Sequence, residues 1–234
     1  KAHLTIVHQR RQLQELNASK DKFFSIIAHD LRSPFSVLHI LIELTLEDIA
    51  DSGQTKLERT METLKTSTDH LYALVENLLT WARIQRGMMD YHPRRIDLKE
   101  VVARNIALLT PNAEQKQITL KNMIKEKIVV LVDGHMIEAI IRNLLSNALK
   151  FTDAGGSVEV SAISDDHEVT VSVSDTGIGI AEEHIPKLFQ IDAKYKRPGT
   201  AQEKGTGMGL VLCKEFVEQH SGNIWVESEF VKGS

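Results

Sequence analysis

The chain has 234 residues, of which 42% are hydrophobic and 26% are charged, and its formal net charge is -4. This length suits one large or two modest folded domains, and two domains are the better expectation. The slight acidic excess offers no basic surface to a nucleic-acid backbone, and no apolar run is long enough to span a bilayer, so neither nucleic acid nor direct membrane contact is expected. The single cysteine, Cys213, lies in an apolar helical run and cannot form an intrachain disulfide, which fits a buried structural role in a reducing, cytoplasmic setting. The chain starts at Lys1 without an initiator Met, and we expect it to be a fragment of a longer protein.

Apolar residues recur at helical spacing through the first part of the sequence, up to about residue 89. A long first helix is predicted up to Leu46, turn residues follow at 51–54, and a second helix is predicted from Thr55 to a C-terminal cap at Gly87. Two helices with this much apolar surface cannot bury it between themselves, so we expect a homodimer in which two helical hairpins form a four-helix bundle. Packing of the hairpin against the second half of the same chain is the alternative.

Beyond a linker at 91–96 the hydrophobic pattern is mixed. Strands near helices without regular alternation indicate an α+β sandwich, with one mixed sheet covered by helices on one face. The predicted strands are 118–120, 128–132, 158–163 and 169–174, and the predicted helices are 98–116, 136–150 and 209–220.

The first motif with chemical potential surrounds His29 on the predicted first helix. Asp30 follows it directly, and Ser33 lies one turn later on the same face, before Pro34. A neutral imidazole is a competent nucleophile at physiological pH, and an adjacent carboxylate can orient it or take its proton. Because Pro34 has no N–H to donate, a bend is expected just after the histidine. Taken alone, one of the chain's 10 histidines would more often be incidental.

The second motif, on the predicted helix 136–150, pairs Asn143 with Asn147. The two side chains are one turn apart and share a face, so their amide oxygens could face a Mg²⁺ ion and its phosphates. Lys150 and Phe151 close the same stretch and could contact a phosphate and a base, respectively. Without the other motifs, such an asparagine pair would more often be exposed surface.

Two glycine-rich motifs follow. Asp175 ends a predicted strand and opens a Gly177-x-Gly179 turn, and its carboxylate, which can only accept hydrogen bonds, would favour the amino group of adenine. A second glycine series directly precedes the predicted helix 209–220, whose first N–H groups would favour phosphate. The series comprises Gly205, Thr206, Gly207, Met208, Gly209 and Leu210. The polar stretch 190–204 between the two motifs is predicted to be a mobile lid, with a solvated loop as the alternative.

The order and spacing of these motifs resemble the sensor histidine kinases of two-component signalling. In that family a phenylalanine precedes a His-Asp/Glu-Leu-Arg sequence and a proline, as Phe24 and Pro34 do here. The resemblance implies that His29 is phosphorylated and that Asp30 is its acid/base partner. Many members have Thr or Asn where this chain has Ser33, a position that helps to align water for dephosphorylation of the partner, so phosphatase activity is left open.

The second half resembles the ATP-binding domain that histidine kinases share with the gyrase and heat-shock chaperone ATPases. A Walker-type Gly-x-x-x-x-Gly-Lys-Ser/Thr sequence is absent. The resemblance implies ATP and Mg²⁺ as cofactors, with Asn143 and Asn147 at the metal and phosphates. It also implies that Asp175 reads adenine and that the last glycine series lines the phosphates.

The resemblance covers essentially the whole chain and implies a domain order. It predicts a coupling helix at 1–22, a dimerisation and histidine phosphotransfer domain at 23–90, a linker at 91–96 and a catalytic ATP-binding domain at 97–234. The expected activity is ATP-dependent autophosphorylation of His29 and phosphoryl transfer to an aspartate of a response-regulator receiver domain. The expected location is cytoplasmic, either free or as part of a membrane-anchored sensor. The alternatives are a catalytically inactive dimeric phosphorelay scaffold and a gyrase-type ATP-driven clamp.

Overall fold

The computed structural model describes residues 35, 36, 38, 40, 42, 54–86, 88–165, 167–190, 197–201, 203 and 207–234. The chain divides into two compact units, Lys1–Ala82 and Arg83–Ser234. The predicted coupling helix at 1–22 and the residues His29, Asp30 and Ser33 lie outside the described residues. In the part of the chain that is described, no helix is both long and apolar enough to cross a membrane.

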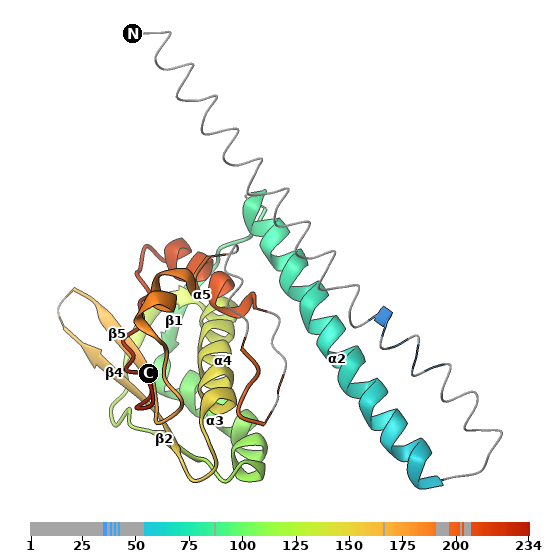
Figure 1. Ribbon diagram of the computed structural model, residues 1–234. Helices are drawn as coiled ribbons and strands as arrows, with labels where there is room; N and C mark the ends of the chain where they lie inside the picture. Colours follow the sequence, from blue (N-terminus) through green and yellow to red (C-terminus); the bar gives the residue numbers. More distant parts are fainter. Residues whose placement is uncertain are drawn as a thin grey trace. The chain divides into compact units, whose positions relative to one another are not determined.

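In the first unit, the main described element is the long helix α2 (Gln54–Gln85), which corresponds to the predicted second helix (Figure 1). Leu74 is buried on this helix with 1% of its surface exposed. Met61, Tyr72 and Leu79 are exposed by 47%, 69% and 46%, and their spacings of eleven and seven residues place them on one stripe of the helix. Unit 1 therefore presents apolar side chains that its own described residues leave uncovered.

The second unit contains all the described strands, in two sheets rather than the single mixed sheet that we expected. In the first sheet β1 and β3 pair antiparallel, with Pro93 opposite Asp133. In the second sheet β2 runs parallel to β4, and β4 runs antiparallel to β5, so the mixed character belongs to this sheet alone. The strands are β1 (Pro93–Asp97), β2 (Thr119–Asn122), β3 (Val129–Asp133), β4 (Ser157–Ser164) and β5 (Val169–Asp175).

Most of the segment expected to be a linker, 91–96, lies in strand β1 (Pro93–Asp97). The first residue of this strand is a proline, which suits the start of a strand because it has no N–H to place in the ladder. The strand forms through its antiparallel pairing with β3, more than thirty residues later in the chain, and a local hydrophobic pattern does not reveal such a partner.

The helices of the second unit lie close to their predicted positions. The helix expected at 136–150 starts two residues earlier, because Asp133 caps its N-terminus. The observed elements are α3 (Leu98–Gln115), α4 (Gly134–Phe151), a 3₁₀ helix η1 (Glu182–Lys187) and α5 (Gly209–Gln219).

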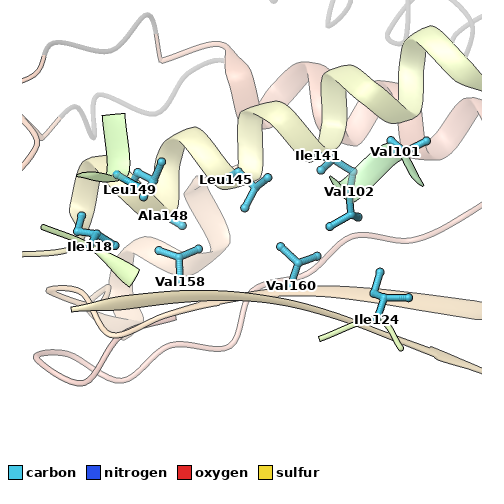
Figure 2. Packing of buried hydrophobic residues seen from close by; sticks show 11 residues of the cluster. Val101, Val102, Ile118, Ile124, Ile141, Leu145, Ala148, Leu149, Val158 and Val160 are labelled. Atoms are coloured by element: carbon cyan, nitrogen blue, oxygen red, sulfur yellow. The ribbon is translucent and has the colours of Figure 1, made fainter. Parts of the chain in front are cut away.

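The core of this unit lies between α4 and the three-stranded sheet (Figure 2). Leu145 on α4 and Val158 and Val160 on β4 have no exposed surface. In Figure 2 the α4 side chains point towards the two valines, and Val102 of α3 lies beside them. This packing fixes which side of α4 faces the sheet, and hence which side remains for a ligand.

Candidate nucleotide-binding site

The asparagine pair lies on the side of α4 that faces away from the sheet. Leu145 and Ala148 are buried against the sheet, whereas Asn143 and Asn147 are half-buried. Since residues four apart on a helix share a face, the two amide groups point to the same side. The core packing of α4 thus presents the asparagines side by side.

Lys150 and Phe151 continue the same face in the last turn of α4. The Lys150 ammonium nitrogen lies 4.9 Å from the centroid of the Phe151 ring, within the range of a cation–π interaction. Burial lowers the pKa of Lys150, and the nearby carboxylate of Glu203 partly opposes this effect. A partly desolvated cation at this position interacts strongly with an anionic ligand.

The Asp175 turn is hydrogen-bonded to the C-terminal end of α4. The N–H of Ile178 donates to the Phe151 carbonyl over 3.1 Å. A Cβ atom on Gly177 would lie only 2.3 Å from the same carbonyl oxygen, so this close approach requires glycine. The Asp175 turn and the C-terminal end of α4, which are separate in the sequence, are therefore in direct backbone contact.

Asp175 itself is held by its own turn, with one carboxylate oxygen accepting from the Gly177 N–H over 2.8 Å. Burial raises the pKa of Asp175, opposed by hydrogen bonds from the backbone of Gly177 and Ser234. Gly179 adopts a left-handed backbone, with φ of 63°. These features leave the Asp175 carboxylate partly desolvated and oriented, as an acceptor for a specific donor should be.

The start of α5 meets α4 at Asn143. A Cβ atom on Gly209 would lie 2.6 Å from the Asn143 side-chain oxygen, so the two helices approach through this glycine. The thiol of Cys213 on α5, which is fully buried as predicted, donates to the Ile140 carbonyl of α4 over 3.9 Å. The first N–H groups of a helix have no partner within it, and those of α5 begin at this junction.

The remaining residues of the last glycine series are only partly described. Gly207 is exposed with φ of 74°, Met208 is the N-cap residue of α5, and Leu210 is half-buried in its first turn. Gly205, Thr206 and most of the predicted lid at 190–204 lie outside the described residues. Among the described residues, the structure thus brings the asparagine pair, the Asp175 turn and the Gly209 helix start to one helix, α4.

Sequence reasoning missed Asp133, which holds the N-terminus of α4. One of its carboxylate oxygens accepts from the N–H groups of His135 and Met136, over 2.9 and 3.2 Å. An Asp before an apolar helical run is a usual N-cap signal, so the pattern could have revealed it. Among the described residues, no group of three or more His, Cys, Asp or Glu side chains could hold a metal ion.

The asparagine pair nevertheless fits Mg²⁺ bound together with phosphate. Mg²⁺ keeps several waters and takes only one or two oxygens from the protein, and Asn147 is a half-buried amide on the side of α4 that faces away from the sheet. Asn143 lies one turn before it, against Gly209. This donor set suits a metal that arrives with a nucleotide rather than one held by a protein cage.

Two family descriptions match the chain. Residues 132–234 match the family of histidine kinase-, DNA gyrase B- and HSP90-like ATPases. Residues 19–87 match the His Kinase A (phospho-acceptor) domain. The α+β fold and the junction at α4 therefore belong to an ATPase class that kinases, gyrases and chaperones share.

The individual relatives and solved structures that the chain resembles include kinases within this ATPase class. The adaptive-response sensory kinase SasA of Thermosynechococcus vestitus is 30% identical over 97% of this chain, and the chain spans 61% of that relative. The histidine kinase ThkA, solved in complex with the response regulator protein TrrA, has the same fold, with a TM-score of 0.73 and 19% sequence identity. The match covers 97% of this chain and 63% of the ThkA chain. ShkA, solved in complex with AMPPNP, has a TM-score of 0.64 at 22% identity over 91% of this chain and 44% of that one.

The chain belongs to the sensor histidine kinases of two-component systems. This assignment agrees with the family expected from the motifs, and both expected parts of the fold, the helical region and the α+β domain, are confirmed.

Proposed function

We propose that this chain is the catalytic core of a sensor histidine kinase, which phosphorylates His29 with ATP and passes the phosphoryl group to an aspartate of a response-regulator receiver domain. Residues 1–22 would couple it to an input, 23–90 would dimerise and carry the histidine, and 97–234 would bind ATP. The observation that carries the proposal is the meeting at α4 of three motifs that lie far apart in sequence. Asn143, Gly177 and Gly209 all lie in contact with α4 or within it.

In this proposal ATP lies along the open face of α4. The Asp175 carboxylate accepts a hydrogen bond from the adenine amino group, while Gly177 and Gly179 allow the backbone to approach the base. Lys150 and the first N–H groups of α5 contact the phosphates. Phe151 supplies an apolar surface near the base.

Asn147 and Asn143 would hold Mg²⁺ together with the phosphates. When bound, the ion neutralises phosphate charge. ShkA, which has the same fold, was solved in complex with AMPPNP, and this supports a nucleotide as the ligand of the site. The last glycine series, including Gly205, Thr206, Gly207, Met208 and Leu210, would enclose the phosphates.

In phosphoryl transfer the protein contributes mainly by positioning the histidine and the γ-phosphate, with little covalent chemistry of its own. A ring nitrogen of neutral His29 attacks the γ-phosphorus, the N–P bond forms, and the bond to the bridging oxygen breaks, which releases ADP. Asp30 orients the imidazole and takes the proton from its other nitrogen. Ser33 lies at the position that would align a water molecule for hydrolysis of the phosphoaspartate of the partner, a separate reaction.

A homodimer is the state that the exposed side chains of α2 support. Met61, Tyr72 and Leu79 form one apolar stripe on a helix that matches the phospho-acceptor domain. A second copy would cover this stripe in a four-helix bundle. The ThkA–TrrA complex supports a receiver domain as the other partner.

Incubation of the chain with γ-labelled ATP and Mg²⁺ tests the proposal. Wild type should incorporate label that is lost in acid and kept in alkali, and a His29→Gln variant should incorporate none. His167→Gln serves as the matched control, because His167 is exposed in the β4–β5 connection. ATP binding without label would favour the inactive scaffold, and phosphate release without label would favour the clamp.

A further inference from the structure

The C-terminal end of α4 exposes backbone carbonyls that the helix itself cannot satisfy. The Phe151 carbonyl is bonded by Ile178 of the Asp175 turn. The two preceding carbonyls receive the ammonium group of Lys116, the C-cap residue of α3. The Lys116 nitrogen lies 2.7 Å from the Leu149 oxygen and 3.2 Å from the Lys150 oxygen. A side chain from another helix thus completes the end of the helix that carries the asparagine pair.

The same ammonium reaches a third segment. It lies 2.8 Å from the Thr200 hydroxyl oxygen and 2.9 Å from a carboxylate oxygen of Glu203. An ammonium has three hydrogens, so these acceptors and the two carbonyls saturate it. The Lys116 side chain is only 17% exposed, and a charge at this depth is stable only when it is paired and hydrogen-bonded.

The third segment, the Gly199 turn, comprises Gly199, Thr200, Ala201 and Glu203. Gly199 N–H donates to the Glu203 carbonyl over 2.9 Å, and Ala201 N–H donates to the Glu203 carboxylate over 2.8 Å. The Thr200 N–H donates to the Lys150 carbonyl over 3.0 Å. A Cβ atom on Gly199 would lie 2.8 Å from that same carbonyl. The turn is therefore closed on itself and docked on the end of α4.

The Glu203 carboxylate interacts with two lysines, Lys116 and Lys150. It forms a direct ion pair with Lys116, whereas with Lys150 it interacts only at longer range. Burial raises the pKa of Glu203, but the hydrogen bond from Lys116, backbone hydrogen bonds and the charge of Lys116 outweigh it and lower the pKa. Glu203 is thus a carboxylate that Lys116 holds. Lys150 is the residue that our proposal gives to a phosphate.

We propose that Lys116 is a positioning residue of the nucleotide site, and this inference rests on the proposed function. It fixes the Gly199 turn against α4, a few residues before the glycine series that would line the phosphates. It also keeps the Glu203 carboxylate occupied, so that Lys150 remains free for phosphate. Lys116 does not touch the nucleotide in this scheme.

The test is a double-mutant cycle on the full chain, with ATP–Mg²⁺ affinity measured by titration calorimetry and folding checked by circular dichroism. Lys116→Met should weaken ATP binding about tenfold, the effect of losing one charge-assisted interaction. Adding Glu203→Gln should restore the affinity to within about threefold of wild type, because no carboxylate then competes for Lys150. A role in fold stability alone predicts no such rescue.

Lys121→Met is the matched control, because Lys121 also pairs with a glutamate, Glu159, over 2.8 Å, but on the outer surface of β2 and β4. It should leave ATP affinity unchanged. If Lys116→Met fails to fold, Thr200→Val, which removes the hydroxyl between Lys116 and the Thr152 carbonyl, should give a weaker loss of affinity in the same direction.

Two results would overturn the inference. Wild type that binds ATP and labels His29, with Lys116→Met or Thr200→Val equal to the Lys121→Met control, would refute the positioning role and leave the proposed function intact. Wild type that does not bind ATP would refute both.

Discussion

Removal of the Asp133 carboxylate should destabilise the second unit, because this carboxylate caps the N-terminus of α4. One carboxylate oxygen accepts from His135 and Met136, and the other accepts from the His92 N–H over 3.0 Å. The residue is 5% exposed. Burial alone would raise the pKa of Asp133, but the backbone hydrogen bonds from His92, Met136 and His135, with the charge of His135, outweigh it and lower the pKa.

The magnitude follows from these bonds. Loss of an N-cap costs about 1 kcal/mol, within a range of about 0.5–2. The bond from His92 adds about 1 kcal/mol, the value of an ordinary hydrogen bond and less than is usual for an ionised acceptor, because His92 is exposed and its N–H can bond water instead. Asp133→Ala should therefore cost about 2 kcal/mol of the free energy of unfolding. Asp133→Asn should cost about half as much, because its amide oxygen can still cap the helix.

Urea denaturation at one fixed protein concentration measures these differences. Asp153→Ala is the control, because Asp153 is exposed after the end of α4, and it should change stability by less than about 0.5 kcal/mol. Since the pKa of Asp133 is lowered in the folded state, its stabilisation is present above the ordinary aspartate pKa and is lost as pH falls through the lowered value. A cost for Asp133→Ala no larger than that of the control, or equal costs for Ala and Asn, would refute the capping account.

Three further outcomes are expected. Leu145→Ala should cost about 3–5 kcal/mol in the same denaturation assay, because Leu145 is fully buried between α4 and the sheet, and a cost under about 1.5 kcal/mol would contradict the packing. Burial raises the pKa of Asp175, so ATP affinity measured by calorimetry should decrease as the pH is lowered and this carboxylate protonates, at a higher pH than for an ordinary aspartate. Asp175→Asn should bind ATP weakly and should lack this pH-dependent loss of affinity. The same pH profile in the variant as in wild type would count against an adenine contact. Burial also raises the pKa of the Cys213 thiol to about 12, so iodoacetamide followed by mass spectrometry at about pH 8 should modify it only after denaturation; rapid labelling of the folded chain would disagree with the structure.

Local patterns predicted the helices of the second unit well, because each buries a continuous apolar face. The predicted helix 98–116 corresponds to Leu98–Gln115, and 209–220 to Gly209–Gln219. Strand β1 was missed because its sequence, Pro-Arg-Arg-Ile-Asp, has little apolar character, and its order comes from pairing with β3. The division into two sheets likewise depends on pairings between distant segments.

The residues of the site were predictable as separate motifs, whereas their connections were not. Asn143 and Gly209 could be named from their motifs, but the contact between them brings together positions 66 residues apart. Lys116 carries no motif at all, since a lysine at the end of an amphipathic helix is ordinarily a solvated charge. Its four acceptors become neighbours only when α3, α4 and the Gly199 turn are packed together.

The last turn of α4 joins the two loops that would hold opposite ends of a nucleotide. The carbonyl of Phe151 binds the Asp175 turn through Ile178, and the carbonyl of Lys150, one residue earlier, binds the Gly199 turn through Thr200. Consecutive carbonyls of a helix are fixed relative to each other, so a shift of either loop must strain or break a bond at this turn. The two loops that our proposal gives to the adenine and the phosphates are therefore coupled through adjacent backbone carbonyls of one helical turn. Both loops approach α4 at glycines, because a Cβ atom would lie 2.3 Å from the Phe151 oxygen at Gly177 and 2.8 Å from the Lys150 oxygen at Gly199.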